Sequence, residues 1–372
     1  MDRDRKPERA VNSHSIDIIV PVWNRPVETR DCLVTLMEHA PGARLILVDN
    51  GSDRDTERLL QEFAEILDDR ALLLRNDVNQ GYVRAVNRGL ARAEADISIV
   101  VRNTSRVTAG WLEPLLAFTE SHPDAGIIMP RLVLDNGGRI GADRHEHAGP
   151  FEASHGNLAA MLVKKKLFDR IGGLSEEMDG GVWCLKDYSR RALAGGFLTW
   201  TVPACTVWYR DEVLLGSEVR RTETIQRSMA LYLQRWGEER AYCIYFPEGV
   251  DLNVVEQKFS VILAGARQGS QFHLLVRAQL YREMQQAGYV ERHGNIRVHR
   301  LPRIMPERGA AKALAALTAE HSALIAVTGV DGLPFPGAAG AIPFADLALR
   351  VSSTAAERYT ADKADAICTK SW

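Results

Sequence analysis

Ala95-Asp96-Ile97-Ser98-Ile99-Val100-Val101 runs directly into Arg102-Asn103-Thr104-Ser105-Arg106, and this stretch decides how the chain is organised. The apolar residues up to Val101 predict a buried strand, because aliphatic β-branched runs are typical of strands that are covered on both faces. The residues that follow, 107–114, predict the start of a helix. An open α/β sheet binds its ligand at the carboxyl ends of its strands. We therefore expect the functional site at residues 102–106.

Strands and helices alternate throughout the chain on the N-terminal side of this stretch. Such alternation predicts βαβ units and a mostly parallel sheet, and right-handed crossovers make that α/β sheet doubly wound. The predicted strands are Ser15–Val22, Arg44–Val48 and Ala71–Leu74, and a helix is predicted over Tyr82–Ala93 before the central strand. A helix over Ser217–Trp236 is expected to close this first domain, which we place at residues 15–245.

Length and composition limit the function. At 372 residues the chain has room for two domains. Its 46 basic and 48 acidic residues give a net charge of −2, so nucleic acid is not an expected partner. The five scattered cysteines predict free thiols in a reducing compartment. No apolar run approaches the ~20 residues that a membrane span needs, and the charged start does not resemble a signal peptide. We expect a cytoplasmic protein with a disordered tail at residues 1–14.

A second, smaller α/β domain is predicted at residues 259–372, after a polar linker at 246–258. Its expected strands are Phe259–Ala264, Ile296–Leu301, Ala323–Val327 and Ala345–Val351, and its expected helices are Gln271–Gln286, Ala310–Glu320 and Ala355–Cys368. This part contains no catalytic triad, metal-ligand spacing or dinucleotide fingerprint. We expect it to mediate oligomerisation, to dock a protein partner, or to form a lid over an acceptor.

Residues 15–240 contain a series of short motifs in a fixed order. They are Ile18–Arg25, Val48–Ser52, Asn79–Gly81 with Asn87–Gly89, Val107–Glu113, Met129–Leu132, Met161–Lys164, Leu167–Leu174 and Leu233–Gly237. In order and spacing these motifs resemble the family-2 glycosyltransferases of the GT-A fold. The resemblance implies a GT-A-like fold and a nucleotide-sugar donor, most simply a UDP-sugar.

The resemblance places the donor nucleotide at the first two strand ends. Pro21, Trp23 and Asn24 would surround the base, and Asp49 would contact the base or the ribose. An aromatic ring can stack on a base, and a carboxylate can accept hydrogen bonds from ribose hydroxyls. Asn79 and Gly81 would complete the donor site. The alternatives are structural: Asp49 could belong to a tight turn, and Asn79 and Gly81 could mark a helix start.

The family's Asp-x-Asp motif, whose last Asp binds Mg²⁺ or Mn²⁺, aligns with Arg102-Asn103-Thr104. No carboxylate remains there, so the resemblance supplies no metal ligand, although Asn103 and Thr104 could still contact the donor. The family's catalytic Glu-Asp pair falls on Cys184-Leu185, which leaves Asp187 as the candidate general base and Asp179 as a second one. The family's late His falls on Tyr209.

Two interpretations follow. In the first, the enzyme works without metal: Arg102 and Arg106 hold the diphosphate, and Asp187 takes the proton of an acceptor hydroxyl on a glycan, a lipid carrier or a protein. In the second, the protein is an inactive relative that binds a nucleotide sugar or serves as a scaffold. The two arginines could also lie in a solvated loop, and Asp187 could complement a helix dipole.

Two other groups of charged residues are expected to have no catalytic role. His145-Glu146-His147, with Glu152 and His155, could suggest a metal site, but we interpret this segment as a loop over the acceptor, and no metal is expected. Lys164-Lys165-Lys166 predicts a solvated helix start, which could alternatively meet an anionic acceptor. An acceptor carried by a lipid would place the protein at the membrane periphery.

Overall fold

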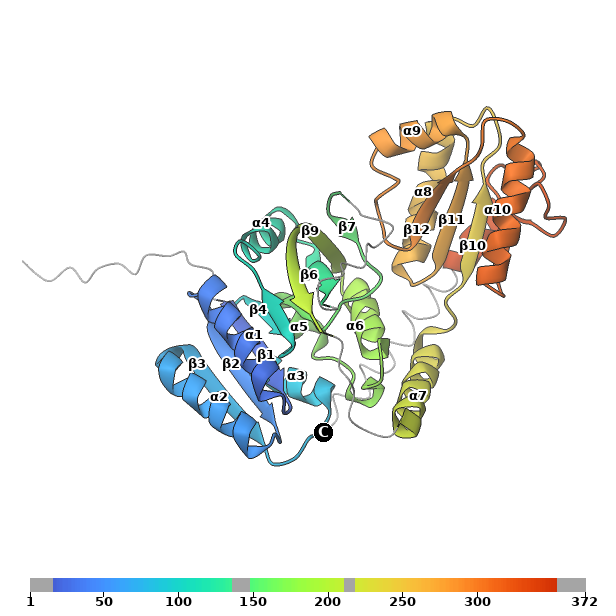
Figure 1. Cartoon of the computed structure of the whole chain (residues 1–372). Coiled ribbons are helices and arrows are strands. Elements are labelled where there is room, and N and C mark those ends of the chain that lie inside the picture. Colours follow the sequence, from blue (N-terminus) through green and yellow to red (C-terminus); the bar gives the residue numbers. More distant parts are fainter. Residues whose placement is uncertain (1–15, 136–147, 211–217, 353–372) are drawn as a thin grey trace, which may run out of the picture.

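A computed structural model describes residues 16–135, 148–210 and 218–352 of the 372-residue chain. The expected tail at 1–14, the segment His145–His147 and the expected helix Ala355–Cys368 lie outside the described residues. Two β-sheets organise the rest, one of nine strands and one of five. Helix α7 leads from the first sheet to the second (Figure 1). None of the described helices is long and apolar enough to cross a membrane.

The first half of the nine-stranded sheet is parallel and follows the expected alternation. Its strands run in the order β3-β2-β1-β4, and all three of these pairings are parallel. The seven residues of β1 are all buried, as its β-branched sequence predicts. The elements are β1 (Ile16–Val22), α1 (Pro26–His39), β2 (Arg44–Asn50), α2 (Arg54–Leu67), β3 (Ala71–Asn76), α3 (Tyr82–Leu90) and β4 (Ile97–Val101).

The second half of this sheet is mixed. Strand β8 is antiparallel to both β4 and β6, β6 is parallel to β9, and β5 and β7 are antiparallel to β9. The α/β class is confirmed, with parallel pairing concentrated in the first half. The elements are β5 (Ser105–Val107), α4 (Glu113–Ser121), β6 (Ala125–Leu134), β7 (Phe151–Glu152), β8 (Ala160–Lys164), α5 (Lys165–Ile171), α6 (Trp183–Ala194), β9 (Leu198–Tyr209) and α7 (Glu218–Trp236).

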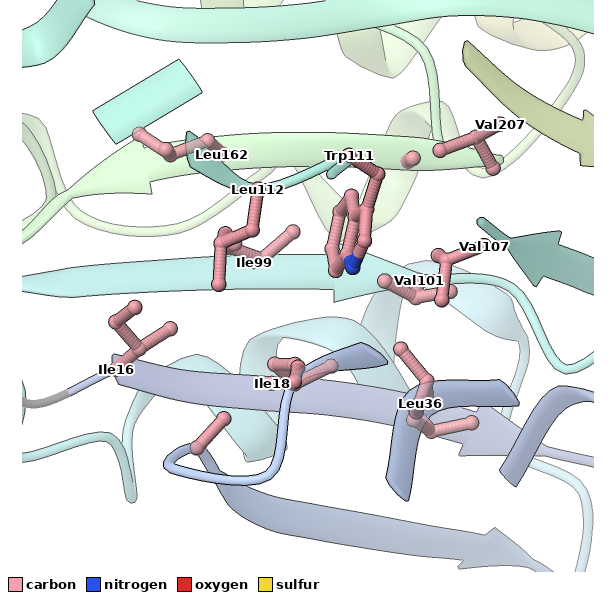
Figure 2. Packing of buried hydrophobic residues seen from close by; sticks show 14 of the residues in the cluster. Ile16, Ile18, Leu36, Ile99, Val101, Val107, Trp111, Leu112, Leu162 and Val207 are labelled. Carbon is pink, nitrogen blue, oxygen red and sulfur yellow. The ribbon is translucent and has the colours of Figure 1, made fainter. Parts of the chain in front are cut away.

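Hydrophobic clusters fill both faces of this sheet. One lies under α1, α2 and α4, and the other lies under α3, α5, α6 and α7. In the first cluster the indole of Trp111 is buried beside Val101 and Val107, as Figure 2 shows. This packing fixes the position of residues 102–104 between β4 and β5. The four described cysteines, Cys32, Cys184, Cys205 and Cys243, are free and buried, as the scattered spacing predicts.

The second sheet is entirely parallel, with the order β12-β11-β10-β13-β14. Its first strand, β10, precedes the expected linker at 246–258, and the second half of that range belongs to helix α8. The elements are β10 (Ala241–Tyr245), α8 (Leu252–Arg267), β11 (Gln271–Val276), α9 (Ala278–Gln286), β12 (Ile296–Arg300), α10 (Pro306–Glu320), β13 (Ile325–Thr328) and β14 (Ile342–Pro343).

Three predictions for this region were wrong. Phe259–Ala264 is part of helix α8, in which Phe259, Ile262 and Ala266 are buried. The expected strand Ala345–Val351 is also helical, and the expected helix Gln271–Gln286 is divided into β11 and α9. Short apolar runs suit a buried helix as well as a strand, which explains the errors. The strands at 296–301 and 323–327 and the helix at 310–320 are confirmed.

The two sheets are joined at Glu152, which is only 1% exposed. Its carboxylate binds Arg267 of α8 through contacts of 2.5 and 2.7 Å and Arg292 at 3.0 Å. The backbone N–H of Glu152 donates to the carbonyl of Arg292, and the N–H of Gly294 donates to the carbonyl of Glu152. The loop before β12 therefore pairs with β7 through its main chain, and this pairing carries a buried ion cluster.

Candidate functional site

A cavity of about 790 Å³ opens at the carboxyl ends of β1, β2 and β4. Because these strands are parallel and adjacent, the residues that follow them meet at one edge of the sheet. The start of α3, residues 179–181, α6 and α7 complete the wall. Seven of the eleven predicted site residues line it: Pro21, Trp23, Asn24, Asn79, Gly81, Arg102 and Asn103.

The end of β1 presents Trp23 and Asn24 to this cavity. Trp23 is 40% exposed, an unusual position for a large apolar ring. Asn24 has a left-handed backbone with a φ of 57°. Its N–H donates to Ser52 Oγ at 3.0 Å, and its Oδ1 accepts from the N–H of Asp53 at 2.8 Å. The loops after β1 and β2 are thus held together.

Asn50 lines the cavity, whereas the predicted residue Asp49 does not. Neighbouring residues of a strand point to opposite faces, so only one of the two can face this cavity. Asp49 is 2% exposed, and its Oδ1 accepts from the N–H of Ser52 at 2.9 Å. Its Oδ2 lies 3.8 Å from Arg75 Nε. The structure therefore places Asp49 in a tight turn, which was the structural alternative to a contact with the nucleotide.

The side chain of Asn50 organises the loop before α3. Its Nδ2 donates to Asn79 Oδ1 at 2.9 Å and to the carbonyl of Gly81 at 3.1 Å. Its Oδ1 accepts from Asn76 Nδ2 and from the N–H of Gln80. Sequence reasoning missed this role, although Asn50 stands inside a quoted motif. Asn79 and Gly81 do reach the cavity, and both also form the helix start.

The central loop divides between the cavity and the protein interior. Arg102 lines the cavity with its guanidinium 5.6 Å from the centre of the Tyr82 ring. Asn103 also lines it, but its amide donates to Thr29 Oγ1 at 3.0 Å. Thr104 is buried outside the cavity wall, and its hydroxyl donates to the carbonyl of Arg210 at 3.2 Å. Of these three residues of the central loop, Arg102 is the charged one that lines the cavity.

Arg106 also points elsewhere. Its guanidinium forms an ion pair with Asp135, which pairs with Arg210 as well. Arg106 lies on β5, paired with Trp208 of β9, and does not belong to the cavity wall. The structure therefore does not bring Arg106 together with Arg102. The side chain of Arg102 lines the cavity, whereas that of Arg106 pairs with Asp135.

Asp187 is fully buried behind the cavity and does not line it. Its Oδ2 accepts from Ser175 Oγ at 2.7 Å and from Arg191 Nε at 2.8 Å, and its Oδ1 accepts from Arg235 and Trp236. Burial alone would raise the pKa of this carboxyl, but Arg191 and these hydrogen bonds lower it overall. A carboxylate so enclosed serves the packing of α6 and α7 and is not placed to meet an acceptor.

Asp179 is the acidic side chain that lines the cavity among the described residues of the wall. Burial raises its pKa to about 6, although hydrogen bonds from the N–H groups of Val83 and Tyr82 act in the opposite direction. Gly81 touches it closely: a Cβ there would collide with Asp179 Oδ2, and the Gly81 φ of +95° disfavours any side chain. Asp179, the second candidate for the general base, therefore lines the cavity.

The N-terminal half of α7 forms a wall that sequence reasoning missed, through Arg221, Thr224 and Ile225. Gly180 allows this approach, because a Cβ there would lie 2.7 Å from both Ser228 Oγ and the carbonyl oxygen of Thr224. The adjacent glycines Gly180 and Gly181 were the available signal, since paired glycines often mark a close backbone approach.

Lys164, the first residue of the predicted solvated lysine run, does not line the cavity. Its ammonium group donates to the carbonyls of Thr119 and His122.

The residues at the Asp-x-Asp position do not fit a divalent cation. Mg²⁺ and Mn²⁺ prefer oxygen ligands, and at a phosphate-binding site one or two of these are usually carboxylates. The Asp-x-Asp position supplies none, and Asp179 is the cavity's single described carboxylate. Within the described residues, no group of three or more His, Cys, Asp or Glu side chains could hold a metal. Three residues that the sequence analysis discussed in connection with a metal have other contacts. Glu152 forms ion pairs with arginines, and His155 Nδ1 lies 2.8 Å from the Gly156 carbonyl oxygen. Tyr209 pairs with Ser105 in the sheet.

Comparison with known proteins identifies the N-terminal part. Residues 17–180 match the model of glycosyl transferase family 2. The protein y4gI of Sinorhizobium fredii is 26% identical over 220 residues, which cover 52% of this chain and 24% of that protein. Polypeptide N-acetylgalactosaminyltransferase 13 of Rattus norvegicus is 30% identical over 96 residues, covering 26% of this chain and 17% of the relative. The chain thus spans a quarter or less of the length of these relatives.

Two solved structures show weaker likeness. GalNAc-T7 with UDP, GalNAc and Mn²⁺ aligns at a TM-score of 0.49 and 12% identity, covering 60% of this chain and 48% of that one. The mannosyltransferase PcManGT of Pyrobaculum calidifontis with GDP-Man and Mn²⁺ aligns at 0.45 and 14%, covering 93% and 81%. These scores add nothing to the fold described above. The match over residues 17–180 agrees with the resemblance of the motifs to that family.

Proposed function

We propose that the protein is a glycosyltransferase that moves a sugar from a nucleotide-sugar donor, most simply a UDP-sugar, to an acceptor hydroxyl. The observation that carries this proposal is the convergence of Trp23, Asn79 and Arg102, from three separate motifs, on one cavity. The cavity volume of about 790 Å³ lies in the usual range of 300–1,000 Å³ for small-molecule sites. The family match over residues 17–180 supports the same activity.

The donor is expected to lie along the carboxyl edge of the sheet. The half-exposed indole of Trp23 can stack on the nucleotide base, and the amides of Asn24 and Asn79 offer hydrogen bonds to base and ribose. Arg102 follows β4 and can bind a phosphate with two parallel N–H groups. This order puts the sugar beyond Arg102, toward Asp179.

Asp179 is the proposed general base. As the acceptor oxygen attacks the anomeric carbon, the acceptor O–H proton passes to the Asp179 carboxylate. A new C–O bond forms, the bond from the anomeric carbon to the diphosphate breaks, and its electron pair leaves on the diphosphate oxygen. A pKa of about 6 keeps Asp179 mostly ionised at neutral pH while leaving it basic enough to accept the proton.

We assign this activity to the part of the predicted domain at 15–245 that precedes β10, with the second sheet as an accessory unit that docks a partner or a second copy. The acceptor class stays a glycan, a lipid-linked carrier or a protein. The name of the rat relative, a polypeptide N-acetylgalactosaminyltransferase, supports a hexosyl-type donor, and its short aligned region of 96 residues carries no acceptor with it.

A non-catalytic relative that binds a nucleotide sugar is the second candidate. It is favoured by Thr104 at the position of the family's metal ligand and by the enclosure of Asp187. Both candidates predict donor binding, so only turnover separates them.

The test measures UDP and UDP-sugar binding by calorimetry, followed by release of UDP in the presence of mixed glycan and lipid acceptors. Wild-type protein is compared with Asp179→Asn and with Asp169→Asn, a matched change on α5 at an exposed residue that pairs with Lys165. Transfer lost in Asp179→Asn alone supports the enzyme. UDP binding without any turnover supports the second candidate, and a failure to bind UDP or any UDP-sugar would overturn both.

A further inference from the structure

The cavity carries an excess of positive charge where the family expects a metal ion. Arg25, Arg102 and Arg221 line it, against the one described carboxylate, Asp179. Arg25 lies 3.7 Å from Glu28 and is partly neutralised by it. The cavity wall therefore carries more positive than negative side chains, which favours a polyanionic ligand.

The residues at the Asp-x-Asp position disagree with a metal site in their bonding as well as in their identity. Asn103 donates its amide to Thr29, and Thr104 donates its hydroxyl to a backbone carbonyl. Thr104 lies outside the cavity wall, and the neutral amide of Asn103 brings no negative charge to a cation. A diphosphate bound here needs another source of positive charge.

Arg221 reaches the cavity from helix α7 and not from a strand end. It belongs to the first turns of α7, whose approach is fixed by the contact of Gly180 with Thr224 and Ser228. Within the parts of the chain that the structure describes, Arg221 forms no ion pair. Its guanidinium is therefore available to a ligand, whereas Arg106, the second arginine expected from the sequence, is held by Asp135.

We propose that Arg221 and Arg102 together bind the donor diphosphate and neutralise it in place of a divalent cation. This inference rests on the proposed function and adds a residue, Arg221, that lies outside every motif of the family resemblance. Guanidinium groups present planar pairs of N–H donors that match phosphate oxygens. Donors aimed at the leaving oxygen stabilise the charge that develops as its bond to the sugar breaks. The electron pair stays on that oxygen, and no redox change or metal is required.

The experiment titrates UDP, UMP and uridine into the full chain by calorimetry, first in EDTA and then with Mn²⁺. The variants are Arg102→Ala, Arg221→Ala, Arg221→Lys and the control Arg227→Ala, an exposed arginine of the same helix outside the cavity wall. UDP is expected to bind in EDTA. Arg221→Ala should weaken UDP binding about tenfold or more, as expected for a lost charge-assisted contact, and leave uridine binding unchanged.

The two further variants sharpen the result. Arg221→Lys keeps the charge but loses the planar pair of donors, so it should recover only part of the UDP affinity. Arg227→Ala should match the wild type. Because Arg221 lies on a helix surface, circular dichroism melts are expected to show all variants equally folded.

Each contrary outcome has a distinct meaning. UDP binding that requires Mn²⁺ would overturn the inference and leave the proposed transferase standing. Binding in EDTA that is equal in Arg221→Ala and wild type would overturn the role of Arg221. A chain that binds neither UDP nor UMP under any condition would overturn the inference together with the proposed function.

Discussion

The carboxylate of Asp187 accepts a hydrogen bond from the indole Nε1 of Trp236 at 2.9 Å, joining α6 to the end of α7 in the protein interior. Arg235, the residue before this tryptophan, donates to the same carboxylate oxygen. Residues that are far apart in the sequence thus meet in one buried network. The network holds the C-terminal end of α7, whereas the N-terminal half of the same helix, which carries Arg221, forms a cavity wall.

Asp187→Asn is expected to destabilise the protein by about 3 kcal/mol, since removing one partner of a buried ion cluster leaves charges uncompensated. Arg191 and Arg235 would face a neutral amide that cannot accept from all four of the present donors. Urea denaturation at pH 7 measures the loss. At a temperature where the variant is folded, UDP binding should persist, because Asp187 does not line the cavity.

Asp169→Asn provides the control, because its carboxylate is 56% exposed and its pairing with Lys165 should contribute little. Acid titration adds a second measurement. The pKa of Asp187 is lowered in the folded protein, so its stabilisation is present above the unfolded pKa of about 4 and is lost as the pH falls through the folded value. The acid-dependent loss should be smaller in Asp187→Asn. Equal stability of wild type and variant would contradict this account of the network.

The pH dependence of transfer tests Asp179. A general base must be ionised, and burial raises the pKa of this group to about 6. Activity expressed as kcat/KM should therefore rise with pH through about 6 and level off above it. In Asp179→Asn this limb should disappear together with most of the turnover. A rate that rises at the same pH in the asparagine variant would assign the titration to another group.

Local sequence pattern was sufficient for the parallel half of the first sheet. Its apolar runs are almost entirely buried and are separated by clear turn signals, so β1, β2 and β4 were correctly predicted. In the second sheet the pattern failed at Phe259–Ala264, because an apolar run of a few residues suits a buried helix equally well. Only packing on β11 through Gly265, which contacts Phe272, settles the choice.

The site was predictable where it follows strand ends and not where it depends on distant contacts. Trp23, Asn79 and Arg102 were found because parallel strands end at a common edge. Whether Asp49 or Asn50 lines the cavity depends on the face of β2 to which each side chain points. The sequence motif does not reveal that face. Asp179 and Arg221 reach the cavity through tertiary packing around Gly81 and Gly180, which periodicity does not reveal.

Gly81→Ala should impair donor binding more than its backbone strain alone would. The φ of Gly81 is +95°, and an added Cβ would collide with the Asp179 carboxylate. Gly110→Ala is the matched control, since Gly110 has a φ of +73° with no atom within 4 Å of the added Cβ. Both variants should lose about 1–2 kcal/mol of stability from the left-handed backbone. Only Gly81→Ala should also weaken UDP-sugar binding, measured by calorimetry, and equal binding in the two variants would remove Asp179 from the site.

Glu152→Gln is expected to weaken the junction of the two sheets. The buried carboxylate neutralises Arg267 and Arg292, and an isosteric amide would leave both cations without a counter-charge. We expect a loss of about 3 kcal/mol, seen as a lower thermal midpoint. Glu62→Gln is the comparison, because its pair with Arg30 is 3.6 Å long and about half exposed, so it should change stability by less than about 1 kcal/mol.

A junction that depends on Glu152 should also become sensitive to proteases between α7 and α8 in Glu152→Gln alone. If the two variants melt together and are cut alike, the main-chain pairing of Glu152 with residues 292–294 is sufficient to join the sheets.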